Sequence, residues 1–349
     1  MSSECSPLAI PHGSLVVVTG ANGFIASHIV DQLLAQNYLV RGTVRSIPKS
    51  QWLLTHFSAK YGAGKFSLIE VPNMAVAHAY DDAVKGASGL IHVATPVMVT
   101  CDPHEGISTV VNGTIYALES ARTEPLMKRV VLTSSSAAAA SPAPDVPFEL
   151  GEGTWNEKVV RAAWAPPPYE GLQRRLDVYA ASKTQGEKAA WKWVIEQQPG
   201  FVLNTVLPNV NVGAMVSVEH QGFPSTAGWV RAVWEGFRGK YADDMFNKAQ
   251  WFVNVRDCAL VHVAALIYAD VRAERLFAFA QPYNWNDMLA CMRRLYPDRQ
   301  FIEDLPGLGR DVSTVMNEGA ENLLRRISGH GWTGLEESIR EATGDYAGA

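Results

Sequence analysis

Cysteine is scarce in this chain of 349 residues, and its four copies are scattered along the sequence. Cys5, Cys101, Cys258 and Cys291 show none of the paired spacings of a disulfide framework or a zinc site. A scattered set of this kind is typical of a reducing compartment. We therefore expect neither a disulfide framework nor a bound metal ion.

Long apolar runs and blocks of basic residues are lacking as well. No apolar run is long enough to cross a bilayer, and residues 1–14 lack the basic and apolar segments of a secretory signal. The formal net charge is −5 without any lysine/arginine block, which disfavours nucleic acid as a partner. We expect a cytoplasmic globular protein that binds neither membrane nor nucleic acid.

What the sequence does contain is an alternation of apolar, strand-like runs with helical patterns. Such alternation predicts βαβ units, hence an α/β fold with a doubly wound parallel sheet of the Rossmann type. Ligands of such sheets bind at the carboxyl ends of the strands. The expected strands are 15–18, 38–44, 66–71, 89–94, 129–134 and 201–207, and the expected helices are 50–61, 78–85, 106–123 and 177–197.

The stretch 141–171 breaks this alternation. Its six prolines preclude a regular helix or central strand through most of its length. A loop this long in a compact domain is usually functional or mobile. We therefore expect a long functional or mobile loop over this stretch.

The C-terminal third is rich in aromatic residues and predicts a smaller, substrate-binding lid domain. Segments near 252–255 and 276–279 are expected to return to the main sheet. Trp229, Trp234 and Phe237 recur near helical spacing, which is more typical of a packed core than of a pocket wall. We expect a nucleotide-binding domain over 12–208 with 252–280 returning to it, and a lid over 209–251 and 281–349.

The most informative stretch is SLVVVTGANGFIASHI at 14–29, an apolar run, a glycine turn and an amphipathic segment. Strand, turn and helix bring several backbone N–H groups and a helix N-terminus to one point, which suits the pyrophosphate of a dinucleotide. The spacing is G-x-x-G-x-x-A, with Ala26 at the place of a third glycine. The expected pyrophosphate contacts are Gly20, Asn22, Gly23, Phe24 and Ile25.

The residues at the end of the second expected strand indicate whether the cofactor is NAD or NADP. A carboxylate there binds the ribose of NAD, whereas a nearby arginine accommodates the 2′-phosphate of NADP. This chain has Arg45 and Lys49 and no acid in that segment, which favours NADP(H). Arg41 and Lys49 are equally compatible with solvated surface charges. Further expected contacts after the next strands are Asn73, Ala94, Thr95 and Pro96.

A tyrosine and a lysine four residues apart, Tyr179 and Lys183, share one face of the expected helix. An ammonium about 4 Å from a phenol, at an effective dielectric near 20, is worth roughly 4 kcal/mol, or about three pKa units. We therefore expect Lys183 to lower the pKa of Tyr179 and make it a proton donor. Tyr61 and Lys65 match the same spacing, but two intervening glycines disfavour a helix there, so we expect no function.

Ser134, Ser135 and Ser136 end the fifth expected strand, at the same edge of the sheet. A hydroxyl there can orient a carbonyl oxygen, although serines at strand ends are also common in ordinary turns. Together with Tyr179 and a dinucleotide at one edge, they favour carbonyl chemistry.

Several segments resemble a known family. TGANGFIA at 19–26, LTSS at 132–135, YAASK at 179–183 and LPN at 207–209 resemble the extended short-chain dehydrogenase/reductases. Within them, VRGTVRS, TWN and GWTGLEESI resemble the dihydroflavonol 4-reductase-like branch, and most of all its fungal-type NADPH-dependent aldehyde and carbonyl reductases. The resemblance runs from about residue 12 to 342.

The resemblance implies Tyr179 as proton donor, Lys183 as its partner and Ser135 as the hydroxyl that orients the carbonyl. It also implies Asn112 in a proton relay. Asn73 stands where the family commonly has aspartate. Cofactor contacts on the nicotinamide side are implied for Thr133, Pro208, Asn209 and Val210.

The expected activity is NADPH-dependent reduction of an aldehyde or ketone, with an apolar, aromatic or polyketide-like body, by a monomer or homodimer. A sugar-nucleotide epimerase or dehydratase on the same fold is one alternative, although it requires cationic groups for a diphosphate. A non-catalytic NADP-binding regulator is the other, although such a protein has no need of the serine, tyrosine and lysine.

Overall fold

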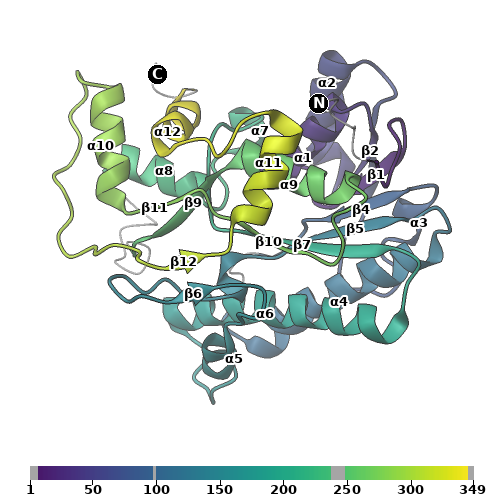
Figure 1. Cartoon of the computed structure of the whole chain (residues 1–349), viewed down its shortest axis with the longest axis horizontal. Helices are drawn as coiled ribbons and strands as arrows, with labels where there is room; N and C mark the ends of the chain where they lie inside the picture. Colours follow the sequence, from purple (N-terminus) through teal and green to yellow (C-terminus); the bar gives the residue numbers. More distant parts are fainter. Residues whose placement is uncertain (1–6, 97–99, 237–247, 345–349) are drawn as a thin grey trace, which may run out of the picture.

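The computed structural model describes residues 7–96, 100–236 and 248–344 (Figure 1). Its centre is a seven-stranded parallel sheet in the order β10-β7-β5-β4-β1-β2-β3. The expected doubly wound α/β fold is thereby confirmed. The strands of this sheet are β1 (Leu15–Val18), β2 (Leu39–Val44), β3 (Phe66–Glu70), β4 (Gly89–His92), β5 (Arg129–Thr133), β7 (Val202–Pro208) and β10 (Arg275–Ala278).

Helices cover both faces of the sheet because its strands are apolar on both sides (Figure 1). In β1, Val16 and Val18 pack into the core under one set of helices, while Val17 packs into the core on the other face. The first set is α1 (Phe24–Ala35), α2 (Ile47–Tyr61), α9 (Val255–Ile267) and α11 (Glu318–Ser328). The second set is α3 (Asp81–Val84), α4 (Pro103–Thr123) and α6 (Gly171–Gln197).

The order of the strands reverses beside β1. The chain runs outward from β1 to β3 and then crosses back to β4 on the other side of β1. In open α/β sheets, ligands bind at the carboxyl ends of the strands next to such a reversal. The ends of β1, β4 and β5 are therefore where a site is expected.

A smaller unit of the chain is built on the three-stranded sheet β11-β9-β8, with its own core. Its elements are β8 (Val210–Val212), β9 (Gln250–Asn254), β11 (Gln281–Tyr283), α8 (Ala227–Trp234), α10 (Trp285–Leu295) and α12 (Leu335–Thr343). The prediction that 252–255 returns to the main sheet is wrong, because β9 pairs with β8 and β11. Only β10 returns there, where it occupies the edge beside β7.

The proline-rich stretch contains two short elements, β6 (Glu149–Leu150) and α5 (Glu157–Ala163). Both lie in the proline-free interval between Pro147 and Pro166. β6 pairs in parallel with β12 (Thr314–Val315), so a segment near the C-terminus holds this loop in place. The remaining elements are the 3-10 turn η1 (Ser136–Ala138) and the short helix α7 (Val218–Gln221).

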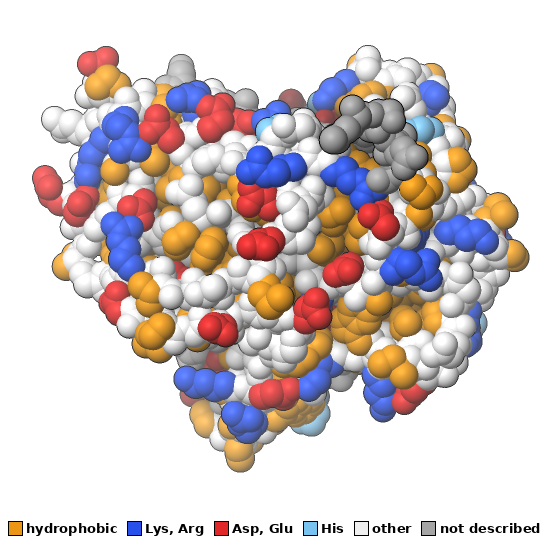
Figure 2. Space-filling model, in the orientation of Figure 1, with side chains coloured by type: hydrophobic (Ala, Val, Ile, Leu, Met, Phe, Trp, Pro, Cys, Tyr) orange, Lys and Arg blue, Asp and Glu red, His pale blue; other side chains and the backbone are white. Residues whose placement is uncertain are grey.

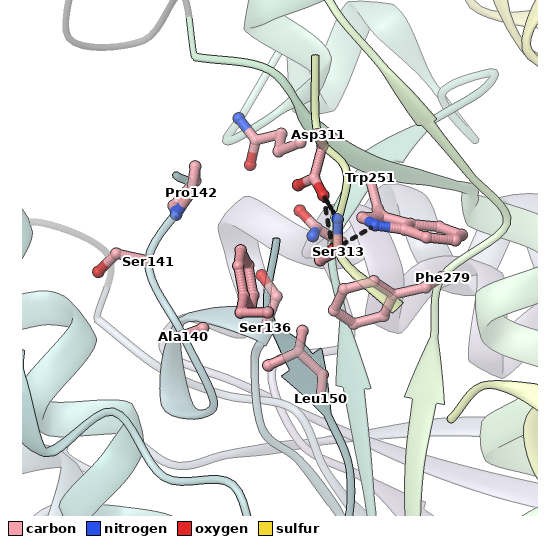
Figure 3. A pocket seen from close by; sticks show the side chains of 12 residues that line it. Ser136, Ala140, Ser141, Pro142, Leu150, Trp251, Phe279, Asp311 and Ser313 are labelled. Carbon is pink, nitrogen blue, oxygen red and sulfur yellow. Dashed lines mark hydrogen bonds between the residues drawn. The ribbon is translucent and has the colours of Figure 1, made fainter. Parts of the chain in front are cut away.

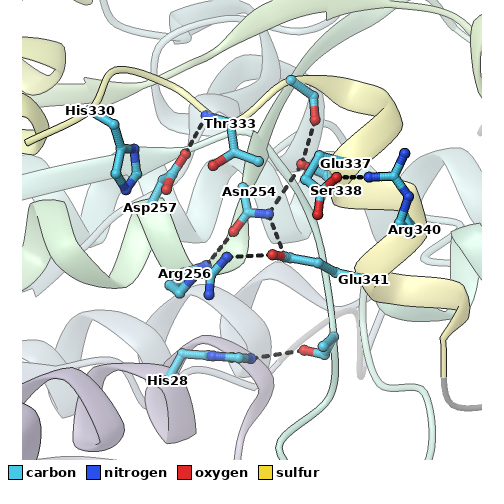
Figure 4. A network of polar contacts seen from close by, with 12 residues as sticks. His28, Asn254, Arg256, Asp257, His330, Thr333, Glu337, Ser338, Arg340 and Glu341 are labelled. Atoms are coloured by element: carbon cyan, nitrogen blue, oxygen red, sulfur yellow. Dashed lines mark hydrogen bonds and ion pairs between the residues drawn. The ribbon is translucent and has the colours of Figure 1, made fainter. Parts of the chain in front are cut away.

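Polar contacts tie the motif GWTGLEESI to the rest of the fold (Figure 4). The Asn254 side-chain amide donates to Glu341 Oε2 at 2.8 Å and to Ser338 Oγ at 3.2 Å. The Thr333 N–H donates to Asp257 Oδ2 at 2.6 Å. These contacts fix α12 and the segment before it against the start of α9.

Acidic and basic side chains are interspersed on the face of the molecule that Figure 2 shows. In the ranges that the structure describes, no helix is both long and apolar enough to cross a bilayer. The three described cysteines, Cys101, Cys258 and Cys291, are free thiols, and Cys5 lies outside the described residues.

Candidate active site

The glycine turn follows β1 at the point where the strand order reverses. Gly20 has φ of 65°, and a Cβ there would lie 3.3 Å from the Cα of Ala94. Gly23 is the N-cap of α1, and no side chain caps this helix end. The turn therefore presents free N–H groups of a helix N-terminus in a place that only a residue without a side chain fits, as a pyrophosphate site requires.

A buried threonine connects the glycine turn to the end of β4. Thr19 Oγ1 accepts hydrogen bonds from the N–H groups of Val93 and Ala94, both at 2.9 Å. It also lies 3.1 Å from His92 Nδ1. The predicted contacts Ala94, Thr95 and Pro96 consequently lie beside the turn, and burial lowers the pKa of His92 to about 3, which keeps it neutral.

Lys183 is buried at the same edge, with a relative exposure of 6%. Its Nζ donates to the Thr133 carbonyl at 2.7 Å and to Thr95 Oγ1 at 3.2 Å. Burial lowers the pKa of Lys183 to about 8, and the negative charge of Glu187 acts in the opposite direction. Two of the predicted cofactor residues, Thr95 and Thr133, therefore hold the predicted catalytic lysine.

Tyr179 lies one turn before Lys183 on α6, and its phenol shares a hydrogen bond with the Ser135 hydroxyl. The expected lowering of its pKa by Lys183 is wrong. Burial raises the pKa of Tyr179, the bond to Ser135 acts in the opposite direction, and the Lys183 ammonium donates to Thr133 and Thr95 instead. The phenol is therefore neutral at pH 7 and carries its proton.

Ser134 is distinguished from Ser135 by its partner. Its hydroxyl donates to Glu187 Oε2 at 2.6 Å, on the next turn of α6 after Lys183. Ser135 instead is the N-cap of η1, where its Oγ accepts from the Ala137 N–H at 3.2 Å, and it stays partly exposed. Of these two serines, Ser135 is the one that is free to meet a substrate.

Sequence reasoning missed the buried ion pair that supports this arrangement. Glu187 Oε1 accepts from Arg275 Nε at 2.9 Å and from Thr205 Oγ1 at 2.9 Å. Arg275 also donates to the Thr154 carbonyl and lies 3.9 Å from the centre of the Trp155 ring. The only available signal was the spacing, because Tyr179, Lys183 and Glu187 follow one another at intervals of four on one helix face.

The end of β2 has the expected positive charge. Arg45 and Lys49 are exposed, and within the described ranges neither makes a hydrogen bond or ion pair. Arg41 differs, because its guanidinium donates to the carbonyls of Ala83 at 2.7 Å and Lys85 at 2.9 Å. Arg41 therefore anchors the fold, whereas Arg45 and Lys49 can meet a phosphate. Glu70, the last residue of β3, accepts from the Ile47 N–H at 2.9 Å, so one carboxylate lies at the start of α2.

Two predicted residues are placed less favourably. Asn112 is exposed on α4, and no hydrogen bond is recorded for it; the α4 residues that face α6 include Val110, which approaches Gly186. The relay role of Asn112 stays a prediction. The exposed Asn73 uses its side-chain oxygen to accept from the Ala75 N–H at 2.9 Å.

After β7, the predicted nicotinamide segment enters the smaller sheet. Pro208 ends β7 beside Ala278, and Val210 begins β8 in a buried position. The Asn209 side chain, between them, accepts from the Val210 N–H at 2.9 Å and lines a pocket. A residue that the sequence did not point to, Gln221 of α7, donates to the Asn22 carbonyl at 3.1 Å and so holds the glycine turn from outside.

The pocket that begins at Asn209 and Ser136 is small, with a cavity volume of about 20 Å³ that opens to solvent (Figure 3). Its walls are half apolar and half polar, with Phe148, Trp251 and Phe279 as aromatic members. Trp229 and Trp234 pack into the core of the smaller unit instead, as their spacing suggested. Phe237 lies outside the described residues. The pocket is lined in full by Ser136, Ala140, Ser141, Pro142, Phe148, Leu150, Asn209, Gln250, Trp251, Phe279, Asp311 and Ser313.

A doubly wound sheet, a glycine turn between β1 and α1, and a serine, tyrosine and lysine at the same edge are typical of dinucleotide-dependent enzymes. Comparison with known families agrees, because the model described as "NAD dependent epimerase/dehydratase family" matches residues 16–273. The chain belongs to this family, the extended short-chain dehydrogenase/reductases.

Two relatives of similar length are named as an aldehyde reductase and a ketoreductase. Aldehyde reductase 2 of Sporidiobolus salmonicolor is 39% identical over 337 residues, covering 96% of each chain. The ketoreductase adrE of Penicillium rubens is 40% identical over 339 residues, covering 95% of this chain and 96% of the relative. Among solved structures, Gre2 of Candida albicans in complex with NADPH matches with a TM-score of 0.80 and 26% identity, covering 97% of this chain and 99% of that one.

Proposed function

We propose that the chain reduces an aldehyde or a ketone to the alcohol with NADPH. The observation that carries the proposal lies at one edge of the sheet, beside the glycine turn. Lys183 donates to Thr95 and Thr133 there, and the Tyr179 phenol shares a hydrogen bond with Ser135, whose neighbour Ser136 lines the pocket. Its relatives among aldehyde reductases and ketoreductases support the same reaction class.

The residues present fit a dinucleotide. The uncapped start of α1 and the close approach of Gly20 to Ala94 suit a pyrophosphate, and the exposed Arg45 and Lys49 suit the 2′-phosphate that distinguishes NADPH from NADH. When bound, this cofactor supplies the hydride that adds to the carbonyl carbon. Such a group is bound in a structurally similar protein, Gre2 of Candida albicans.

The chain itself supplies the proton and the orientation. Tyr179, neutral because burial raises its pKa, donates its phenolic proton to the carbonyl oxygen as negative charge develops there. Ser135 donates a hydrogen bond to the same oxygen and fixes its direction. Lys183 keeps a positive charge below about pH 8 and stabilises the phenolate that remains on Tyr179.

The pocket favours a carbonyl compound over a sugar nucleotide. Its lining includes no lysine or arginine among the residues that the structure describes, whereas a substrate diphosphate calls for cationic partners. Aromatic side chains instead favour an apolar or aromatic body, because such a pocket gains by removing apolar area from water.

The test is the loss of NADPH absorbance with a panel of aryl and alkyl aldehydes and ketones, beside a binding measurement for NADPH. We expect oxidation of NADPH with at least one apolar or aromatic carbonyl compound, and far slower oxidation of NADH. Tight binding of NADPH without turnover on any carbonyl compound would contradict the proposal and favour a regulator.

A further inference from the structure

A segment of the smaller unit crosses to the start of α1, where the glycine turn lies. Residues 213–226, called the strap below, leave β8, form the short helix α7 and continue into α8. No residue of α7 is buried, and its partly buried Val218 packs against a small cluster that includes Phe24 of α1. The position of α7 therefore depends on its contacts with the elements that would bind a dinucleotide, and not on a core of its own.

The Gln221 side chain makes the closest of these contacts. Its Nε2 donates to the Asn22 carbonyl at 3.1 Å and to the Gly23 carbonyl at 3.4 Å. The same nitrogen donates to Ser27 Oγ at 3.0 Å, and Gln221 Oε1 accepts from the Ser217 N–H at 3.0 Å. Backbone groups fix the orientation of this amide at both ends, because a carbonyl only accepts and an N–H only donates.

These bonds determine in which direction the turn presents its donors. In a planar trans peptide group, the carbonyl and the following N–H point in opposite directions. Because Gln221 bonds to the Gly23 carbonyl, the Phe24 N–H of the same peptide group points away from α7. Phe24 is the first residue of α1, so this N–H has no partner within the helix and suits a phosphate oxygen.

Two histidines hold the strap at positions on either side of Ser217. His28 of α1 donates from Nε2 to the Ala214 carbonyl at 2.8 Å (Figure 4). His220 of α7 stacks on Trp52 of α2, with 5.1 Å between the ring centres and 16° between the ring planes. The strap thus connects the glycine turn with α2, the helix that begins just after Arg45.

We propose that Gln221 is a positioning residue for the cofactor, which holds the glycine turn in the form that binds the pyrophosphate. The stack of His220 on Trp52 keeps Gln221 in place. This inference rests on the proposed use of NADPH and adds a residue of the smaller unit to the cofactor site. Since NADPH and NADH share the pyrophosphate, Gln221 serves both alike, whereas Arg45 distinguishes them.

The experiment measures Kd for three ligands: NADPH, NADH and adenosine 2′-monophosphate, which has the 2′-phosphate but no pyrophosphate. Gln221→Met keeps the length of the side chain and removes the amide. We expect it to raise Kd for NADPH and NADH by the same factor of about 3–10, the equivalent of one hydrogen bond. Kd for adenosine 2′-monophosphate should stay nearly unchanged.

Two substitutions of His220 test the stack. His220→Ala should weaken NADPH and NADH in the same pattern by a smaller factor, because Gln221 remains but is held less firmly. His220→Phe keeps a ring on Trp52, so its Kd values should return to those of the unaltered chain. A loss in His220→Phe as large as that in His220→Ala would contradict the role of the stack.

Gln198→Met is the matched control. The Gln198 amide also donates to a carbonyl, that of Ile195 at 2.7 Å, but it lies at the end of α6 remote from Tyr179 and Lys183. We expect all three Kd values to stay as in the unaltered chain.

An unchanged Kd for NADPH in Gln221→Met would overturn the inference. So would an equal loss for all three ligands, because a general disturbance of the fold does not distinguish the pyrophosphate. An unaltered chain that binds NADPH but reduces no carbonyl compound would contradict the proposed function and leave the Kd values to decide on Gln221.

Discussion

Two tyrosines in this chain are followed four residues later by a lysine, and the two copies have different surroundings. Tyr61 is the last residue of α2, Gly62 follows with φ of 93°, and Lys65 lies beyond the helix. The Tyr61 hydroxyl donates to Asp31 Oδ1 at 2.8 Å. Tyr179 and Lys183 lie within α6, at the carboxyl edge of the sheet, where Lys183 is buried against Thr133.

The difference shows that spacing has chemical meaning only where the backbone brings both side chains to a place that a ligand can reach. Two arginines, Arg41 in β2 and Arg45 directly after it, show the same difference. The Arg41 guanidinium donates hydrogen bonds to the carbonyls of Ala83 and Lys85. Arg45, four residues later, is exposed and can meet a ligand. In both cases one copy stabilises the fold and the other is free for function.

The largest effect is expected from removing one hydroxyl from each tyrosine. Tyr179→Phe should lower kcat for carbonyl reduction by about 10²–10⁴-fold, because the proton donor is lost, while the Kd for NADPH stays nearly unchanged. Tyr61→Phe, the matched variant, should keep full activity. Equal losses of kcat in the two variants would contradict the assignment of Tyr179 as the proton donor.

The second-largest effect is expected from Glu187, a charged residue that follows Tyr179 and Lys183 but has no counterpart after Tyr61 and Lys65. Glu187 continues the spacing after Lys183, whereas Ile69 occupies the corresponding position after Lys65. Glu187→Gln leaves Arg275 buried and unpaired, so we expect a loss of about 3–5 kcal/mol in the free energy of unfolding. Urea denaturation measures it, and a change below about 1 kcal/mol, the usual value of an exposed pair, would contradict it.

The two arginines can be separated by cofactor kinetics. Arg45→Ala should raise KM for NADPH by about tenfold or more and leave KM for NADH nearly unchanged, because one charge-assisted contact to the 2′-phosphate is lost. Arg41→Ala should instead lower the melting temperature and affect both cofactors alike. If Arg45→Ala weakened both cofactors equally, Arg45 would have no part in binding the 2′-phosphate.

Lys183, and not Lys65, should determine how the reaction rate depends on pH. Burial lowers the pKa of Lys183 to about 8, so its charge is present below that pH and is lost above it. We expect kcat/KM for reduction to be level near pH 7 and to fall above about pH 8. Glu187→Gln should move this fall to lower pH, because Glu187 raises the lysine pKa. Lys65→Ala should leave the profile unchanged, and a fall that moved with Lys65 would contradict the assignment.

The smallest effect completes the comparison. Tyr61→Phe removes one partly buried hydrogen bond to Asp31, so we expect it to lower the free energy of unfolding by about 1 kcal/mol. Thermal unfolding of this variant beside Tyr179→Phe measures the difference. A clearly larger loss of stability in Tyr179→Phe would mean that Tyr179 also serves the fold.

The local sequence pattern was sufficient to predict the main sheet and the edge of it where the candidate site lies. The runs that became β1, β2, β3, β4, β5 and β7 were apparent because a strand buried on both faces is a short uninterrupted apolar run. The same rule could not assign β9, because an apolar strand fits either sheet. Its partner strand β8 pairs with it across 42 residues of chain, from Val210 to Phe252. Glycines and the Tyr179–Lys183 spacing located the site for a similar reason, because their geometry is local.

Features that depend on distant partners could not be predicted. The direction of the Tyr179 pKa shift depends on where the Lys183 ammonium points, which Thr95 and Thr133 decide. The exposure of Asn112 depends on which face of α4 meets α6. Gln221 became notable only when the fold brought it to the Asn22 carbonyl, 199 residues away in the chain.

The ion pair between Glu187 and Arg275 spans 88 residues of chain. During synthesis, the Glu187 carboxylate of α6 is made roughly 4–18 s before its partner Arg275 at ordinary elongation rates. The hydrogen bond between Asp145 and Arg310 spans 165 residues and forms later still. A nascent chain that ends between Glu187 and Arg275 therefore holds Ser135, Tyr179 and Lys183 without the positive charge that pairs with Glu187.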